Sequence, residues 1–89
     1  MMAKFDPDWA VHPGETLHEA LAERHMSQSA LAVATGFSQK HITHVIHGKS
    51  GIGTDFAIAL EEVLGISAKL WLNLQSNYEL FHARKRHGQ

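Results

Sequence analysis

Polar side chains rich in hydrogen-bond donors occupy one side of segment 39–47 if that segment is a helix. Ile42, Val45 and Ile46 recur at spacings of three and four, so they form a stripe that faces the core. The opposite side presents Gln39, Lys40, Thr43, His44 and His47. On base edges, Gln pairs with adenine, Lys with guanine, and the Thr methyl group contacts thymine. We therefore expect a helix that enters a DNA groove and presents this face to base edges.

A second short helix precedes this segment. Ser27 is a good N-cap, and Leu31, Ala32 and Ala34 give the following turns an apolar face, which predicts a helix over about 28–35. Gly36 then adopts the left-handed conformation of a tight turn, and Phe37 packs back on the first helix. Ser38 caps the second helix. Gly48 ends it and leaves Lys49 placed for a phosphate.

The ordered set of these features resembles the helix-turn-helix of lambdoid repressors and Xre-type regulators. It comprises Ser27-Gln28, Leu31-Ala32, Gly36, Ser38, Ile42 and Gly48-Lys49. Ile46 departs from the pattern, because many relatives have Glu there. The resemblance implies that Gln28 and Ser38 bind phosphates while Gln39, Lys40, Thr43 and His44 read bases. We expect Lys49 and His47 to contact phosphates as well. The alternative is a helical hairpin whose polar face is only solvated.

Composition favours a single intracellular domain. The chain has 89 residues, 44% of them apolar, so it buries a modest core that gains from a partner subunit. It has no cysteine, no apolar run near the ~20 residues of a membrane span, and no signal-peptide pattern at its start. We expect a cytoplasmic protein. A net charge of −1 is low for a DNA-binding protein, but Lys40 and Lys49 flank the predicted reading face.

Histidine is frequent, with eight residues in the chain, and His41, His44 and His47 recur every third position. This spacing raises the question of a metal site. No Cys, Asp or Glu within the helix completes a ligand set, so we predict no metal and no cofactor. Two alternatives remain: surface histidines without a role, or histidines whose protonation near pH 6 strengthens DNA binding.

The remaining segments predict an all-α fold of five helices in a compact, lambda repressor-like bundle. Residues 1–11 form an extended arm. A first helix runs from His12-Pro13 to about Arg24, Thr54 caps a fourth helix that ends at Gly65, and Ser67 starts a fifth over about 68–84. We divide the chain into the arm, a DNA-binding core at 12–66, and a C-terminal helix at 67–89 that belongs to the same domain.

The fifth helix carries a wide apolar stripe. Spacings of three and four place five residues on one side: Leu70, Trp71, Leu74, Tyr78 and Phe81. The stripe either docks on its own domain or forms part of a two-fold seam with another copy. Xre-type regulators commonly bind as dimers, because one short helix covers few base pairs. We assign Trp71, Leu74, Tyr78 and Phe81 to packing and dimerisation.

Two further segments resemble the HigA family of type II antitoxins. They are His12-Pro13-Gly14-Glu15 and segment 70–78, Leu-Trp-Leu-Asn-Leu-Gln-Ser-Asn-Tyr, and the likeness covers about residues 12–82. It implies a homodimer that represses its own operon and neutralises a HigB-like ribonuclease toxin. The acidic residues Glu61-Glu62 and Asp6/Asp8 could contact a basic surface of such a toxin. Alternatively, they only make the surface of the protein soluble. The alternatives are a stand-alone or phage-borne regulator without a toxin, and a protein-interaction module with a vestigial helix-turn-helix.

An enzyme is disfavoured by the motifs that the chain lacks. It has no Cys nucleophile, no Gly-rich phosphate loop after a strand, and no His-Glu-x-x-His motif, because Ala22 stands where His18-Glu19 would require the second His. A small bundle also offers little room for a buried triad.

Overall fold

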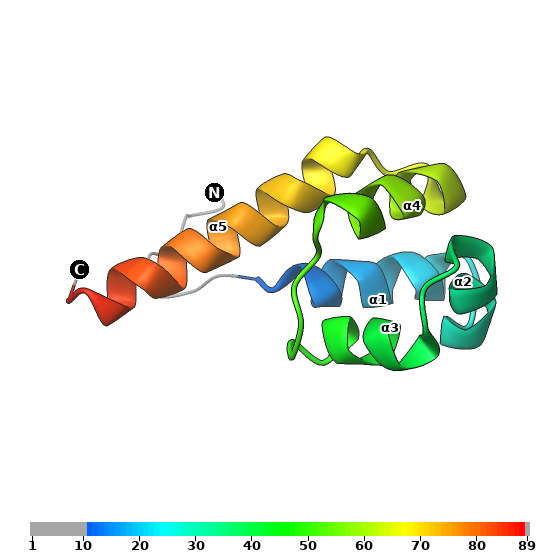
Figure 1. Cartoon of the computed structure of the whole chain (residues 1–89), viewed down its shortest axis with the longest axis horizontal. Coiled ribbons are helices and arrows are strands. Elements are labelled where there is room, and N and C mark those ends of the chain that lie inside the picture. Colours follow the sequence, from blue (N-terminus) through cyan, green and yellow to red (C-terminus); the bar gives the residue numbers. More distant parts are fainter. Residues whose placement is uncertain (1–10, 89) are drawn as a thin grey trace, which may run out of the picture.

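Five helices account for the architecture of residues 11–88, the part of the chain that this computed structural model describes. They are α1 (Pro13–Glu23), α2 (Gln28–Thr35), α3 (Gln39–Ile46), α4 (Thr54–Leu64) and α5 (Ala68–Arg86), and these residues include no strand. The predicted all-α fold is confirmed. The first four helices form a bundle, whereas α5 packs by its first half and then extends past the others (Figure 1). The predicted compact shape therefore holds only for α1 to α4. The predicted arm lies, except for Val11, outside the described residues.

Serine caps and left-handed glycines set most of the helix ends where the sequence predicts them. The Oγ atoms of Ser27, Ser38 and Ser67 each accept a hydrogen bond from the backbone N–H three residues on. Gly36 and Gly65 end α2 and α4 with positive φ angles of 82° and 78°. These contacts satisfy backbone groups that have no partner inside the helix.

One predicted cap is wrong. Gly53, not Thr54, is the N-cap of α4, and no side chain caps that end. The Gly53 carbonyl accepts the first helical hydrogen bond, from the Ala57 N–H at 2.9 Å. Burial of Phe56 and Ala57 fixes the helix in this register, so packing decides the start of α4 rather than a capping side chain.

The core lies between the five helices. Its fully enclosed members come from every helix and include Leu17, Leu31, Ile42, Val45, Phe56, Leu60 and Trp71. The sequence stripe on α5 is less buried than predicted, because Leu70 is 45% exposed. Trp71 alone of the α5 residues is fully enclosed, so it anchors the helix.

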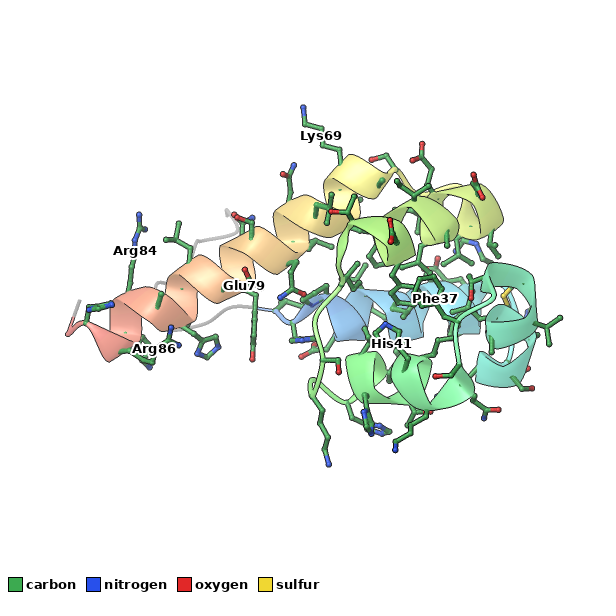
Figure 2. The ribbon with its side chains drawn as sticks, in the orientation of Figure 1. Phe37, His41, Lys69, Glu79, Arg84 and Arg86 are labelled. Atoms are coloured by element: carbon green, nitrogen blue, oxygen red, sulfur yellow. The ribbon has the colours of Figure 1, made fainter. Side chains whose placement is uncertain are left out.

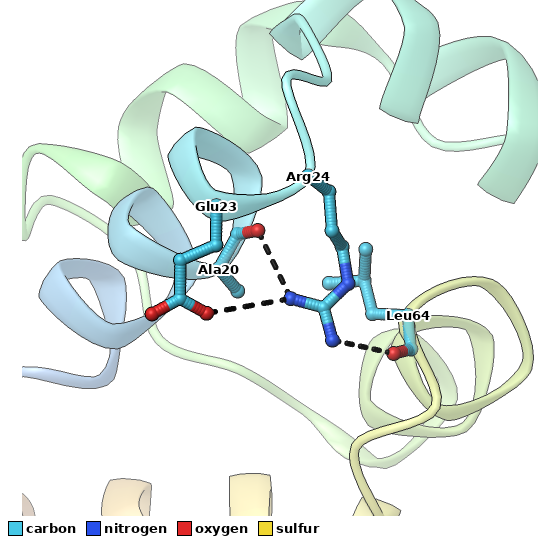
Figure 3. A network of polar contacts seen from close by, with 4 residues as sticks. All are labelled: Ala20, Glu23, Arg24 and Leu64. Atoms are coloured by element: carbon cyan, nitrogen blue, oxygen red, sulfur yellow. Dashed lines mark hydrogen bonds and ion pairs between the residues drawn. The ribbon is translucent and has the colours of Figure 1, made fainter.

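Arg24 ties the end of α1 to the end of α4 (Figure 3). Its Nη1 donates to the Ala20 carbonyl at 3.0 Å, and its Nη2 donates to the Leu64 carbonyl at 2.9 Å. The Leu64 carbonyl lies in the last turn of α4, where carbonyls lack helical partners, while the Ala20 carbonyl also accepts from the Arg24 backbone N–H at 3.3 Å. The side chain thus joins segments forty residues apart in the sequence.

Across residues 11–88, none of the helices combines the length and the hydropathy that a bilayer crossing requires.

Candidate nucleic-acid interface

The outer face of α3 presents the predicted reading residues to solvent. Gln39 and Lys40 are exposed, while Thr43 and His44 are half-buried. Behind them, Ile42 and Val45 are fully enclosed in the core. The buried pair fixes the rotation of α3, so its polar face is held outward as one set.

A hydrogen bond between α2 and α3 fixes part of this surface. Thr43 Oγ1 donates to Gln28 Oε1 at 2.7 Å. The Thr43 hydroxyl hydrogen is therefore committed to the protein, and its methyl group and the Gln28 Nε2 amide are left for a ligand. Residues fifteen apart in the sequence meet here, which the spacing along one helix does not predict.

The predicted phosphate-binding residues surround the reading face. Ser38 Oγ accepts from the His41 N–H at 3.0 Å, which leaves its own hydrogen to donate outward. The His47 Nδ1 is hydrogen-bonded to the Thr43 carbonyl at 3.0 Å, and this orients the ring at the end of α3. Lys49 is exposed in the loop after α3, and its N–H donates to the His44 carbonyl at 2.8 Å.

His41 does not belong to the outward row that the sequence suggests. Its ring lies 5.0 Å from Phe56 and 5.5 Å from Phe37, measured between centroids, in a cluster that joins α3 to the start of α4. Figure 2 shows Phe37 and His41 directed into the bundle. In the described part of the chain, no three His, Cys, Asp or Glu side chains converge as metal ligands would.

Charge is unevenly distributed around α2 and α3. Residues 24–54, which hold both helices and the loop after them, contain no Asp or Glu, whereas Arg24, Lys40 and Lys49 are cationic. Glu15 and Glu19 on α1 line a depression together with His47, at the end of α3. Segment 24–54 thus contributes no carboxylate to this surface, despite the chain's net charge of −1.

The start of α1 lies directly against the backbone of α3. A Cβ atom on Gly14 would lie 2.0 Å from the Val45 carbonyl oxygen, so only glycine permits this approach. The buried His12 caps α1 by accepting from the Gly14 N–H at its Nδ1, 2.9 Å away. Burial lowers the pKa of His12, outweighing the Glu15 carboxylate and a backbone hydrogen bond with Ser50. A neutral imidazole is what the cap requires.

The predicted packing and dimerisation residues divide into two groups. Trp71 is enclosed and the half-buried Leu74 packs against the core, whereas Tyr78 and Phe81 are half-buried further along α5. The Tyr78 ring meets His12 edge-on at 4.7 Å and lies 4.4 Å from His82. Trp71 is a packing residue, and an interface between copies would use the other three.

Known proteins share this arrangement. A family model described as helix-turn-helix (HTH_3) matches residues 17–71, from within α1 to the first turn of α5. The chain belongs to this helix-turn-helix family. The family consists of DNA-binding regulators, and catalysis is not typical of it.

Individual members of the family support the predicted likeness to HigA. The Pseudomonas aeruginosa antitoxin HigA, solved with the higBA promoter, is 38% identical with a TM-score of 0.85, covering 90% of this chain and 88% of its own. Antitoxin GraA in complex with its operator is 29% identical with a TM-score of 0.81, covering 99% and 88%. Virulence-associated protein I of Dichelobacter nodosus is 39% identical over 72 residues, 80% of this chain and 67% of its own. The HigA-type helix-turn-helix predicted from the sequence is confirmed.

Proposed function

We propose that this chain is a sequence-specific DNA-binding repressor and the antitoxin of a HigB/HigA-type module. The observation that carries the proposal is the outward face of α3, held in place by Ile42 and Val45 in a stretch without carboxylates. Two solved proteins of the same fold are bound to a promoter or an operator. The proposed action requires no cofactor and no catalytic residue, and it takes place in the cytoplasm, where the operator is.

In this function, α3 enters the major groove and its side chains contact base edges. Gln39 and Lys40 lie in the first turn, where a recognition helix meets the bases, and their exposed ends donate to adenine and guanine. Thr43 contributes its methyl group, and His44 a ring nitrogen. Each bidentate pair discriminates against the wrong base by about 1–3 kcal/mol.

Phosphate contacts come from the ends of the helices. Gln28 and Ser38 lie at the N-termini of α2 and α3, where backbone N–H groups attract anions. Lys49 and His47 contact the DNA backbone from the C-terminal end of α3. Because these contacts carry no sequence information, they set the register in which α3 reads bases.

Binding as a homodimer supplies the affinity that one short helix lacks. Two copies related by a two-fold axis read half-sites about 34 Å apart. Leu74, Tyr78 and Phe81 are the apolar groups that α5 offers for this seam. Sedimentation equilibrium should give a dimer for the wild type and a monomer for Phe81→Asp, and a wild-type monomer at all concentrations contradicts this assembly.

A mobility shift with the DNA upstream of the chain's own gene, at about 100 mM salt, tests the function. The double variant Gln39→Ala/Lys40→Ala should abolish specific retardation without lowering the unfolding temperature. Lys69→Ala is the matched control, because Lys69 points away from the bundle on α5 (Figure 2). Absence of a specific shift by the wild type contradicts the proposal and favours a protein-interaction module.

The toxin partner is tested separately. Glu61 and Glu62 are exposed on α4 and suit a basic, RNA-binding surface. Co-expression with the reading frame beside its gene should give a complex in which the ribonuclease is inactive. A chain that binds its operator but has no such neighbour is a stand-alone regulator.

A further inference from the structure

The loop between α3 and α4 is held by a side chain from α5. The Ile52 N–H donates to Gln75 Oε1 at 2.9 Å, across twenty-three residues of sequence. Ile52 is buried, so its N–H needs a partner within the protein. This bond fixes the loop three residues after Lys49, whose side chain is exposed.

A second hydrogen bond fixes the orientation of the Gln75 amide. Its Nε2 donates to Glu79 Oε2, one turn along α5, at 2.8 Å. The backbone N–H of Ile52 only donates, and the ionised Glu79 carboxylate only accepts. Glutamine satisfies both at once, because it carries one acceptor and one donor on the same planar group.

Gly51 lets the loop lie directly on this amide. A Cβ atom at Gly51 would lie 2.7 Å from Gln75 Nε2 and 2.9 Å from its Oε1. The amide would have to shift to make room for it. Earlier in the loop, the backbone N–H of Lys49 itself donates to the His44 carbonyl on α3. The loop is thus attached to α3 before Ser50 and to α5 after it.

We propose that Gln75 is a positioning residue that sets the place of Lys49 on the DNA backbone. The inference rests on the proposed function. The hydrogen bond to Glu79 orients the Gln75 amide, and the amide in turn binds the Ile52 N–H. Because the loop is short, fixing Ile52 also restricts the position of Lys49.

The test measures operator affinity against salt concentration, using the duplex upstream of the chain's own gene. Gln75→Met keeps the length of the side chain and removes both hydrogen bonds. Affinity should fall about tenfold for each protomer, the cost of one charge-assisted contact. The slope of log K against log salt should become shallower by about 0.9 per protomer, the value of one phosphate on B-DNA. Asn77→Met, at an exposed amide on the same helix, should change neither quantity.

Two further variants separate positioning from a loss of folded protein. Gln75→Glu places two carboxylates together and should weaken binding, whereas Gln75→Glu/Glu79→Gln exchanges acceptor and donor and should restore affinity and slope. In a Lys49→Ala background, Gln75→Met should have no further effect. Hydrogen exchange at the Ile52 amide, without DNA, should be slow in the wild type and the exchanged pair and fast in Gln75→Met.

The outcomes also distinguish this inference from the proposed function. An unchanged salt slope, an equal loss of affinity in the Lys49→Ala background, or unchanged exchange at Ile52 overturns the positioning role and leaves the DNA-binding function intact. Absence of any sequence-specific binding by the wild type overturns both.

Discussion

α3 and α5 differ in how much of their surface the fold has already covered. The eight residues of α3 include two that are fully enclosed, and they touch α1 and α2 on the inner side. Among the nineteen residues of α5, Trp71 alone is fully enclosed, and the later turns of the helix pass beyond the bundle. The orientation of α3 is therefore set by the core, whereas α5 keeps an apolar side that its own domain does not fully use. The fixed orientation of α3 suits the recognition of DNA bases, whereas the uncovered apolar side of α5 suits contact with another protein chain.

Trp71→Ala should have the largest effect, because it removes the only fully enclosed side chain of α5 among the described residues. Truncation of a buried Trp costs about 3–5 kcal/mol. Urea unfolding at a fixed protein concentration measures the loss. Leu80→Ala, at a residue 47% exposed in the extending part of α5, should cost less than about 0.5 kcal/mol. Equal losses would contradict the division of α5 into a packed and an unpacked part.

Gly14→Ala tests how tightly α3 is held from behind. The added methyl group meets the Val45 carbonyl, so the start of α1 must move away from α3. Overpacking of this kind costs about 1–3 kcal/mol, and operator affinity should fall as α3 is displaced. Gly53→Ser is the matched control, because nothing lies within 4 Å of a Cβ atom there. A variant as stable as the control would show that α1 adapts to the methyl group without strain.

Ser38→Ala and Ser67→Ala compare the same cap on the two helices. Each serine accepts a hydrogen bond from the backbone N–H three residues on, and removing such a cap costs about 1 kcal/mol. Only Ser38 lies at the proposed phosphate surface. Both variants should therefore lose similar stability in urea, while only Ser38→Ala weakens operator binding and its salt dependence. Similar DNA affinities would remove Ser38 from the phosphate contacts.

The features predicted correctly from the sequence are those that act between neighbours along the chain. Capping by Ser27, Ser38 and Ser67 and the left-handed turn at Gly36 depend on residues within a few positions. The same holds for the apolar stripe of α3, where Ile42 and Val45 are enclosed as predicted. Helical period and cap chemistry carry this information.

The features that escaped prediction depend on which helices meet. His41 lies one turn before Val45, at the edge of the apolar stripe of α3, and the partner on which it packs, Phe56, comes from α4. Leu70 fits the apolar period of α5, yet it is 45% exposed. The pairs Gln28–Thr43 and Ile52–Gln75 join different elements. No local pattern encodes such contacts.

His12 gives the smallest expected effect and lies between the two regions, capping α1 beneath α3 and touching Tyr78 on α5. Its pKa is lowered on folding by burial, so the unfolded chain binds more protons at this residue. The stabilising contribution is therefore complete above the unfolded pKa of about 6.5 and is lost as the pH falls through that value towards the lower folded pKa. His12→Asn keeps an acceptor for the Gly14 N–H but does not titrate.

Unfolding free energies at pH 8, 7, 6 and 5 measure this contribution as the difference between wild type and His12→Asn. The other seven histidines are common to both proteins and cancel in the comparison. The wild type should lose more stability than the variant over the acidic part of the range. Parallel profiles would mean that the imidazole is protonated equally in both states, and the cap would then have to come from another group.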